Sequence, residues 1–326
     1  MSLSALTVQQ LRYLVALDRH RNFGDAANAC HVSQPALSTQ VKKVEELLGL
    51  CIFDRSRQPV MPTDRGAKVL VQARRALEQI DRIGVVASEQ DGLCGPYRLG
   101  VIPTLASTLL PMFLPLFARE HPRVTLEIVE TKTDTMLRQL REGTLDGGLA
   151  ATPLNLPGIT EQPLCYEAFY VYLRPGHALA ERTRVRQADL LDDPVWLLGE
   201  GHCFRSQVLA LCSADRTSHA LNLAQVNCDV SSFETLVGLV DAGFGVTILP
   251  ELFVRRLSAE QRAGQVRQFI VPEPVREIGF LHAREHLRCA IGAELYRMLH
   301  DAIPSQLQGR DTAGLEVMLP LSADRN

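Results

Sequence analysis

Residues 7–49 constrain the fold of this chain most, because they hold closely spaced helix signals. Thr7, followed three positions later by glutamine, has the pattern of a capping box in front of an apolar-periodic segment. Ser33 has an N-cap side chain, Pro35 falls in the first turn that would follow, and Gly49 ends that segment. Short helices at this spacing, with small alanines between them, predict a helix-turn-helix unit.

The outer face of this unit carries side chains suited to DNA. The second helix of a helix-turn-helix presents its first residues to base edges, where glutamine pairs with adenine and hydroxyls or lysine contact phosphates or bases. A wing-like segment with two arginines follows. The candidate DNA-binding residues are Ser33, Gln34, Pro35, Ser38, Thr39 and Lys42 in the helix, with Arg55 and Arg57 in the wing. A small helical domain with a merely solvated polar face is the alternative.

Charge is distributed unevenly along the chain. Residues 1–84 carry 12 Lys and Arg against 8 Asp and Glu, whereas the whole chain has a net charge of −3. A mildly basic first quarter on an acidic protein is compatible with DNA binding by that quarter alone.

Several classes of protein are disfavoured by what the sequence lacks. It contains no apolar run of about 18 residues and no signal-peptide pattern at its start, so we expect a cytoplasmic protein without a membrane partner. The 8 cysteines show no short Cys-x₂₋₄-Cys spacing, so we expect neither a metal nor a cofactor. In a reducing compartment most of them should be small buried hydrophobic residues: Cys30, Cys51, Cys94, Cys165, Cys228 and Cys289.

From residue 95 onward, short strand-like runs alternate with helical ones, which favours an α/β sandwich with mainly parallel sheets. The expected strands are 97–102, 125–130, 147–151, 169–173, 194–198, 222–227, 245–250 and 277–283, and the expected helices are 106–122, 133–143 and 231–243. We expect residues 306–326 to form a tail with little structure.

The N-terminal sequence closely resembles that of LysR-type transcriptional regulators. The matching motifs are SQPALS at 33–38, LG at 48–49, IFDR at 52–55 and TDRG at 63–66. The resemblance implies a mainly α winged helix-turn-helix domain (1–63), a linker helix (64–92) and a regulatory domain (93–305). It further implies that the regulatory domain has two Rossmann-like subdomains, as in periplasmic solute-binding proteins, at about 93–172 with 275–305 and about 173–274. A ligand cleft would lie between them.

The linker helix has a pattern of its own. Val69, Ala73, Ala76, Ile80, Ile83 and Ala87 recur at alternating steps of four and three, which fits the a/d seam of a two-helix coiled coil. A helix that packs on its own chain is the alternative. The family resemblance implies a homodimer through this helix, a homotetramer, and promoter DNA and RNA polymerase as partners.

The segment GHCFRSQVLALC at 201–212 resembles the hydrogen-peroxide-sensing OxyR branch of that family. The resemblance implies that peroxide oxidises Cys203 to a sulfenic acid and that Cys212 resolves it as a disulfide. The residues that would bind or activate the peroxide are Thr104, Thr133, His202, Arg205, Glu234 and Arg276. Cationic neighbours and a helix N-terminus at Cys203 would lower its pKa, because the thiolate is the nucleophile.

The nine-residue separation of the two cysteines has a geometric consequence. If 204–211 are helical, the Cα atoms lie about 13 Å apart, whereas a disulfide needs them within about 7 Å. The bond and the intact helix therefore exclude each other, which would couple oxidation to refolding. Two alternatives stay open: a LysR-type regulator with inert cysteines and a small organic co-inducer in the cleft, and a thiol peroxidase. A regulator rather than an enzyme is the main prediction.

Overall fold

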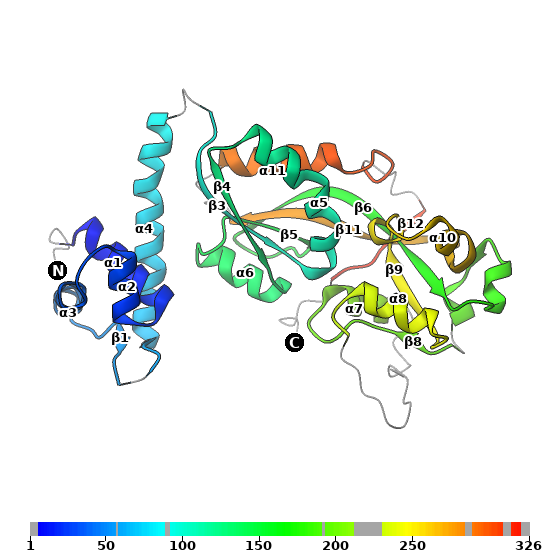
Figure 1. The fold of residues 1–326 in the computed structure, drawn as a ribbon, viewed down its shortest axis with the longest axis horizontal. Coiled ribbons are helices and arrows are strands. Elements are labelled where there is room, and N and C mark those ends of the chain that lie inside the picture. The colour runs from blue at the N-terminus through cyan, green and yellow to red at the C-terminus, as the bar shows by residue number, and fades with distance from the viewer. Residues whose placement is uncertain are drawn as a thin grey trace. The chain divides into compact units, whose positions relative to one another are not determined.

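The computed structural model describes residues 6–56, 58–88, 92–190, 193–211, 230–283, 289–308 and 314–320. The chain forms two compact units, one spanning Met1–Gly92 and the other spanning Leu93–Arg141 and Leu145–Asn326. Figure 1 shows their elements, and each unit is described by itself. Within the described residues, no helix combines the length and apolar character that a membrane span requires.

The first unit is built on three capped helices, α1 (Val8–His20), α2 (Phe23–Ala29) and α3 (Gln34–Leu48). The predicted capping box at Thr7 is present, and Ser33 accepts a hydrogen bond from the backbone N–H of Ala36. Gly49 ends α3 in the left-handed conformation at φ 65°, where glycine costs least. The helix-turn-helix prediction is confirmed.

A short wing follows, made of the antiparallel pair β1 (Phe53–Asp54) and β2 (Met61–Pro62). The long helix α4 (Asp64–Ser88) comes directly after it (Figure 1). Gly66 lies in the first turn of α4 so close to the carbonyl of Ile52 that a Cβ atom would overlap it. The glycine of the TDRG motif is therefore a close-packing residue.

The first residues of the predicted coiled-coil seam pack against other residues of the same chain. Ala73 is only 3% exposed, Val69 packs against the core of the first unit, and the neighbouring Arg74 forms an ion pair with the buried Asp18 of α1. Ala76 and Ile80 are half-buried. Here the alternative of a helix that packs on its own chain holds for Ala73 and in part for Val69, because the start of α4 packs on α1. Pairing of two chains through the rest of the seam stays a prediction. The side chains of Ile83 and Ala87 lie outside the described residues.

The second unit begins with a three-layer arrangement. β3 (Gly95–Val101) lies between β4 (Val124–Glu130) and β5 (Gly147–Thr152), and both neighbours run parallel to it. The helices are α5 (Pro103–Glu120), α6 (Thr133–Arg141) and α11 (Cys289–Ala302). Figure 1 shows α11 and α6 on opposite sides of this sheet.

The other half of the unit surrounds β9 (Val246–Pro250), which pairs with β8 (Val195–Trp196) and with the long strand β6 (Ile159–Leu173). β10 (Val266–Phe269) and β7 (Arg184–Val185) extend the same sheet. Short 3₁₀ helices span Ala178–Glu181 and Gln187–Leu190. The remaining helices are α7 (Cys203–Leu211), α8 (Phe233–Asp241), α9 (Glu251–Val254) and α10 (Ala259–Gln265).

Two long strands join the halves. β11 (Glu273–Ala283) runs antiparallel to β5 and, over most of its length, to β6. Each half of this unit has its own hydrophobic core: the first core lies around β3, β5 and α5, and the second core lies around β9, α7 and α8. Leu164 and Cys165 of β6 pack in the first core, whereas Phe169 and Val171 pack in the second core. The architecture of two Rossmann-like halves with crossing strands is confirmed. The expectation of mainly parallel sheets needs qualification: five of the nine strand pairings among the described residues of this unit are parallel, whereas β6 and β11 pair antiparallel with each other and with β5, β9 and β10.

Two further expectations need correction. Residues 315–317 of the expected tail form β12 (Leu315–Val317), which pairs in parallel with β11. Among the cysteines, Cys165 is buried and Cys30 and Cys94 are half-buried, but Cys51 is exposed, so burial is the wrong expectation for Cys51. The expected strand at 222–227, Cys212, Cys228 and the Cys289 side chain lie outside the described residues.

Candidate functional site

Cys203 is the first residue of α7. The turn before it uses Gly201 in a left-handed conformation (φ 83°) packed against the Lys132 side chain, whose Nζ donates to the carbonyl of Glu200 (2.9 Å). The Cys203 Sγ lies 2.7 Å from Thr133 Oγ1 at the start of α6. A single thiol is thus held at a helix N-terminus, with one hydroxyl partner from the other half of the unit.

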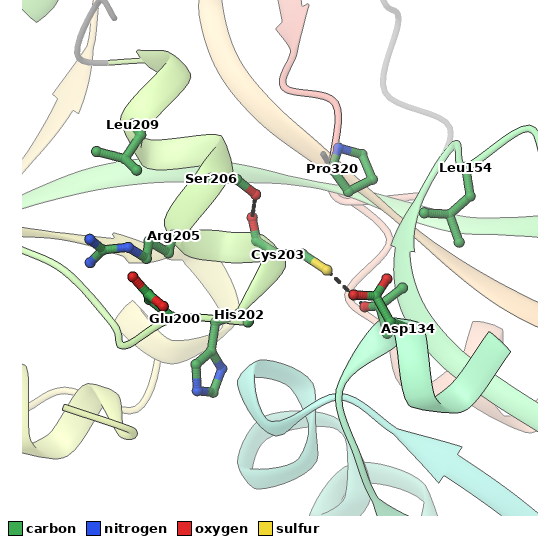
Figure 2. A pocket seen from close by; sticks show the side chains of 11 residues that line it. Asp134, Leu154, Glu200, His202, Cys203, Arg205, Ser206, Leu209 and Pro320 are labelled. Atoms are coloured by element: carbon green, nitrogen blue, oxygen red, sulfur yellow. Dashed lines mark hydrogen bonds between the residues drawn. The ribbon is translucent and has the colours of Figure 1, made fainter. Parts of the chain in front are cut away.

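The thiol lines a cavity of about 280 Å³. Figure 2 shows the Cys203 sulfur directed toward Asp134, with His202 below it and Pro320 above. Thr133, His202 and Arg205 also line this cavity, so three predicted peroxide-site residues meet Cys203 there. The half-buried thiol therefore faces space for a small molecule.

Burial raises the pKa of the Cys203 thiol above its ordinary value, and the Asp134 carboxylate adds to this. The Thr133 hydroxyl, the Arg276 guanidinium and the backbone amide at Cys203 act in the opposite direction. The prediction of a lowered pKa is wrong for this conformation, because desolvation disfavours the thiolate more than the neighbours stabilise it.

Arg205 does not supply the expected positive charge at the sulfur. Its Nη1 donates to the carbonyl of Leu198 (3.0 Å), and Figure 2 shows its guanidinium on the opposite side of α7 from the thiol. Arg205 therefore ties α7 to the segment before it.

Arg276 of β11 is the buried cation of this region, at 1% exposure. Its Nε donates to Glu167 Oε2 (2.7 Å) and its Nη1 to Thr104 Oγ1 (3.2 Å). Its guanidinium carbon also lies 5.0 Å from the ring centroid of Phe204, the residue after Cys203. Arg276 thus links Thr104 of α5 with the start of α7.

Glu167 of β6 is fully buried and completes this network. Its second oxygen accepts the backbone N–H of Leu252 (2.7 Å). Burial raises the pKa of Glu167, while the Arg276 guanidinium and the Leu252 amide pull it down.

Thr104 and Glu234 line a different cavity, of about 410 Å³, together with Ser107 and Glu130. Glu234 is exposed and lies in the first turn of α8. The structure therefore distributes the predicted peroxide-site residues over two spaces, and Arg276 contacts residues of both halves. Cys212, the predicted resolving residue, lies outside the described residues.

The opposite face of α7 is apolar. Phe204, Val208 and Leu211 are each at most 2% exposed and belong to the second core. The Phe204 ring stacks on Phe169 at 5.2 Å and meets Phe233 edge-on at 5.1 Å. Unwinding α7 would remove these three side chains from a packed core.

In the first unit the candidate DNA-binding residues lie mainly on the exposed side of α3. Ser33, Gln34, Pro35, Thr39 and Lys42 are exposed, and Ser38 is half-buried. The Thr39 hydroxyl donates to the Pro35 carbonyl (2.8 Å). Arg55 pairs with Glu45 (2.7 Å) and lies over the Phe23 ring at 5.3 Å. Arg57 lies outside the described residues.

Sequence reasoning missed Glu167 and Pro320, which lies near the C-terminus. A signal for Glu167 was present, because it is a lone acid in the apolar run 164–173 and a buried carboxylate needs a cationic partner. A separate cluster of Glu120, His121 and Glu294 places ligand-type atoms within 4.8 Å of one another. Glu294 is paired with Arg297 (2.6 Å), so ion pairing accounts for this cluster.

Two family models match the chain. Residues 8–67 match the bacterial regulatory helix-turn-helix protein of the lysR family, and residues 90–303 match the LysR substrate binding domain. One match lies in the first unit, and the other covers most of the second.

Curated relatives extend over nearly the whole chain. The hydrogen peroxide-inducible genes activator of Pectobacterium carotovorum is 34% identical over 311 residues, covering 93% of this chain and 98% of the relative. The DNA-binding transcriptional dual regulator OxyR of Escherichia coli K12 is 34% identical over 312 residues, covering 93% and 97%.

Solved structures of OxyR proteins also resemble this chain. Full-length OxyR from Pseudomonas aeruginosa, a cysteine-to-aspartate variant, superposes with a TM-score of 0.76 at 34% identity, covering 91% of this chain and 94% of that one. A hydrogen-peroxide-bound OxyR variant from Corynebacterium glutamicum gives 0.59 at 29% identity, covering 97% and 98%. The chain therefore belongs to the LysR family of transcriptional regulators, and within that family to the OxyR branch.

Proposed function

We propose that this protein is a promoter-binding regulator that senses hydrogen peroxide through Cys203. The observation that carries the proposal is the position of this thiol at the N-terminus of α7, in an open cavity and 2.7 Å from the Thr133 hydroxyl. The names of the curated relatives and the peroxide bound to a structural relative support it.

The chemistry has two balanced steps. The Cys203 sulfur attacks one peroxide oxygen, the O–O bond breaks, and the distal oxygen leaves as water, so that Cys203 becomes a sulfenic acid. The Cys212 thiol then attacks that sulfur, a disulfide forms, and a second water leaves. Thr133 orients the peroxide at the sulfur. His202 lines the same cavity, while Arg276, held by Glu167 and Thr104, contributes positive charge.

Restructuring of α7 would transmit the signal. The Cα atoms at the two ends of α7, Cys203 and Leu211, are about 12 Å apart at the helical rise, and Cys212 follows directly. The disulfide therefore requires α7 to unwind. Unwinding then takes three side chains out of the second core: Phe204, Val208 and Leu211. The surface of the second unit changes as a result, and promoter binding changes with it.

The reaction rate should depend on pH in one direction. Because burial raises the Cys203 pKa, the thiolate is a minor species at neutral pH, and its fraction grows about tenfold per pH unit below the pKa. We expect the rate of Cys203 oxidation to rise by about that factor per unit from pH 6 to pH 8, as followed by quenched-flow mass spectrometry. Thr133→Val should be slower at every pH with the same slope. A rate that levels off below pH 8 contradicts the raised pKa.

Mass spectrometry after stoichiometric peroxide tests the proposal as a whole. The wild-type protein should give a Cys203–Cys212 disulfide, and Cys212→Ser should accumulate the sulfenic acid on Cys203. Consumption of one peroxide equivalent per subunit indicates a sensor, whereas continuous turnover with a reductant indicates a peroxidase. Oxidation spread over all cysteines, or absent from Cys203, overturns the proposal.

A second candidate function rests on the cavity of about 410 Å³ beside Thr104 and Glu234, which has room for a small organic co-inducer. In that case Cys203→Ser would leave promoter output unchanged, with or without peroxide.

DNA binding by the exposed face of α3 belongs to the same proposal, with Gln34 at base edges and Lys42 and the wing arginines at phosphates. Pairing of two chains through the later part of α4, around Ala76 and Ile80, would place two such faces on neighbouring half-sites. A homotetramer and contact with RNA polymerase complete the proposed assembly.

A further inference from the structure

The C-terminal segment 314–320 is fastened to the sheet at both ends of β12. The Glu273 N–H donates to the Gly314 carbonyl (2.9 Å), and the Met318 N–H donates to the Val275 carbonyl (2.8 Å). Val275 directly precedes Arg276. The segment is therefore anchored on the strand that carries the buried cation of the candidate site.

The same segment also holds α7. The carbonyl of Met318 accepts a hydrogen bond from Nε2 of Gln207 (2.6 Å), which is fully buried one turn after Cys203. The Met318 side chain packs in the second core with Val208 and Leu211 of α7. The backbone of Met318 thus connects two elements: its N–H bonds to β11, and its carbonyl bonds to α7.

The segment also reaches the cavity of the thiol. Pro320 is buried and lines the cavity that holds Cys203, and Figure 2 shows it facing the same space as the sulfur. An element that sequence reasoning treated as a tail therefore contacts α7 and the walls of its cavity.

The bond to Gln207 cannot survive unwinding of α7. Gln207 occupies the middle turn of the helix, and among the described residues its Oε1 is buried without a hydrogen-bond partner. The contact with Met318 is thus the hydrogen bond that compensates burial of this amide, and breaking it removes this bond from the Met318 carbonyl as well. A contact of this kind opposes unwinding by a limited amount, as a reversible switch requires.

We propose that residues 314–320 are a latch that holds α7 in its helical form and thereby sets how readily Cys203 and Cys212 come together. The first part of this proposal stands on the contacts of the reduced chain alone, and the second part rests on the proposed function.

Two truncated proteins test the latch. One ends at residue 313 and lacks it, and the matched control ends at residue 320 and keeps it. In the reduced state, hydrogen exchange of the backbone amides at 204–211 should be at least about tenfold faster in the shorter protein and unchanged in the longer one. Amides of β9, in the same core, serve as the internal reference and should stay slow.

If the shorter protein does not fold its second core, single substitutions in the full-length chain test the latch instead. Gln207→Leu removes the donor and keeps an apolar, helix-compatible side chain, so the amides of α7 should again exchange about tenfold faster. Leu319→Ala is the matched control, because Leu319 belongs to the same segment and is 50% exposed. Unchanged exchange in Gln207→Leu overturns the latch.

Disulfide formation distinguishes the two proposals. With stoichiometric peroxide, Gln207→Leu should form the Cys203–Cys212 disulfide faster than wild type, by about the factor seen in exchange. If exchange is faster but the rate of disulfide formation is unchanged, the latch holds α7 in the reduced protein but does not control disulfide formation, and the second part of the proposal is overturned. Faster exchange with no disulfide in any variant, wild type included, overturns the proposed function and leaves the restraint on α7 in place.

Discussion

The Cys203→Ser protein is expected to lose its entire response to stoichiometric peroxide, both in disulfide formation and in promoter-dependent transcription. A serine hydroxyl is too weak a nucleophile to break the O–O bond at neutral pH, and no other described cysteine shares the cavity at the start of α7. In vitro transcription from a responsive promoter, with peroxide titrated against the reduced protein, measures the effect.

The matched control for this substitution is Cys51→Ser. Cys51 is exposed and lies in the first unit, so it is the described thiol that non-specific oxidation would reach most easily. Its replacement should leave the peroxide response intact. If Cys51→Ser lost the response and Cys203→Ser kept it, the sensor would lie in the DNA-binding unit.

Arg276→Leu is expected to destabilise the second core by about 3–5 kcal/mol, because it leaves the Glu167 carboxylate buried without its cation. Urea unfolding followed by the fluorescence of Trp196, the single tryptophan and a member of that core, reports the loss directly. Arg98→Leu is the control: its pair with Glu127 is 38% and 48% exposed, and such pairs contribute about 0–1 kcal/mol.

The Arg276→Leu effect should depend on pH. A carboxyl group whose folded-state pKa is raised binds its proton where the unfolded chain releases it, so stability is lost as the pH rises through the folded pKa. Burial already raises the pKa of Glu167 in the wild type, and removing Arg276 takes away an opposing influence. The variant should therefore lose more stability at pH 8 than at pH 5. The double variant with Glu167→Leu should recover part of it, and a pH-independent loss would mean that packing alone is responsible.

Local signals in the sequence predicted local structure well. The caps at Thr7, Ser33 and Gly49 act within one helical turn, so their side-chain types alone determined where α1 and α3 begin or end. The helix start expected at Cys203 is also present, although no capping residue had marked it, and the resemblance to a sensing segment came from contiguous residues.

What the sequence did not yield depends on contacts between distant segments. β12 forms because it pairs with an edge of β11 that is distant in the sequence: the paired residues Glu273 and Leu315 are 42 positions apart. The pKa of Cys203 follows from burial that residues outside its own segment create, so counting cationic neighbours in the sequence pointed in the wrong direction. The burial of Val69 and Ala73 depends likewise on where α1 lies beside α4, which a heptad pattern does not specify.

The two crossing strands have a consequence for how the regulatory unit breaks down. β6 and β11 pair from Val275–Ala168 to Ala283–Ile159, and β6 contributes side chains to both cores. Neither half keeps a complete sheet if the other unfolds, so we expect the two halves to unfold in one cooperative transition. Damage near α7 therefore lowers the survival of β3, β4 and β5 under heat or protease as well. An irreversibly over-oxidised sensor would thus become a substrate for degradation as a whole unit.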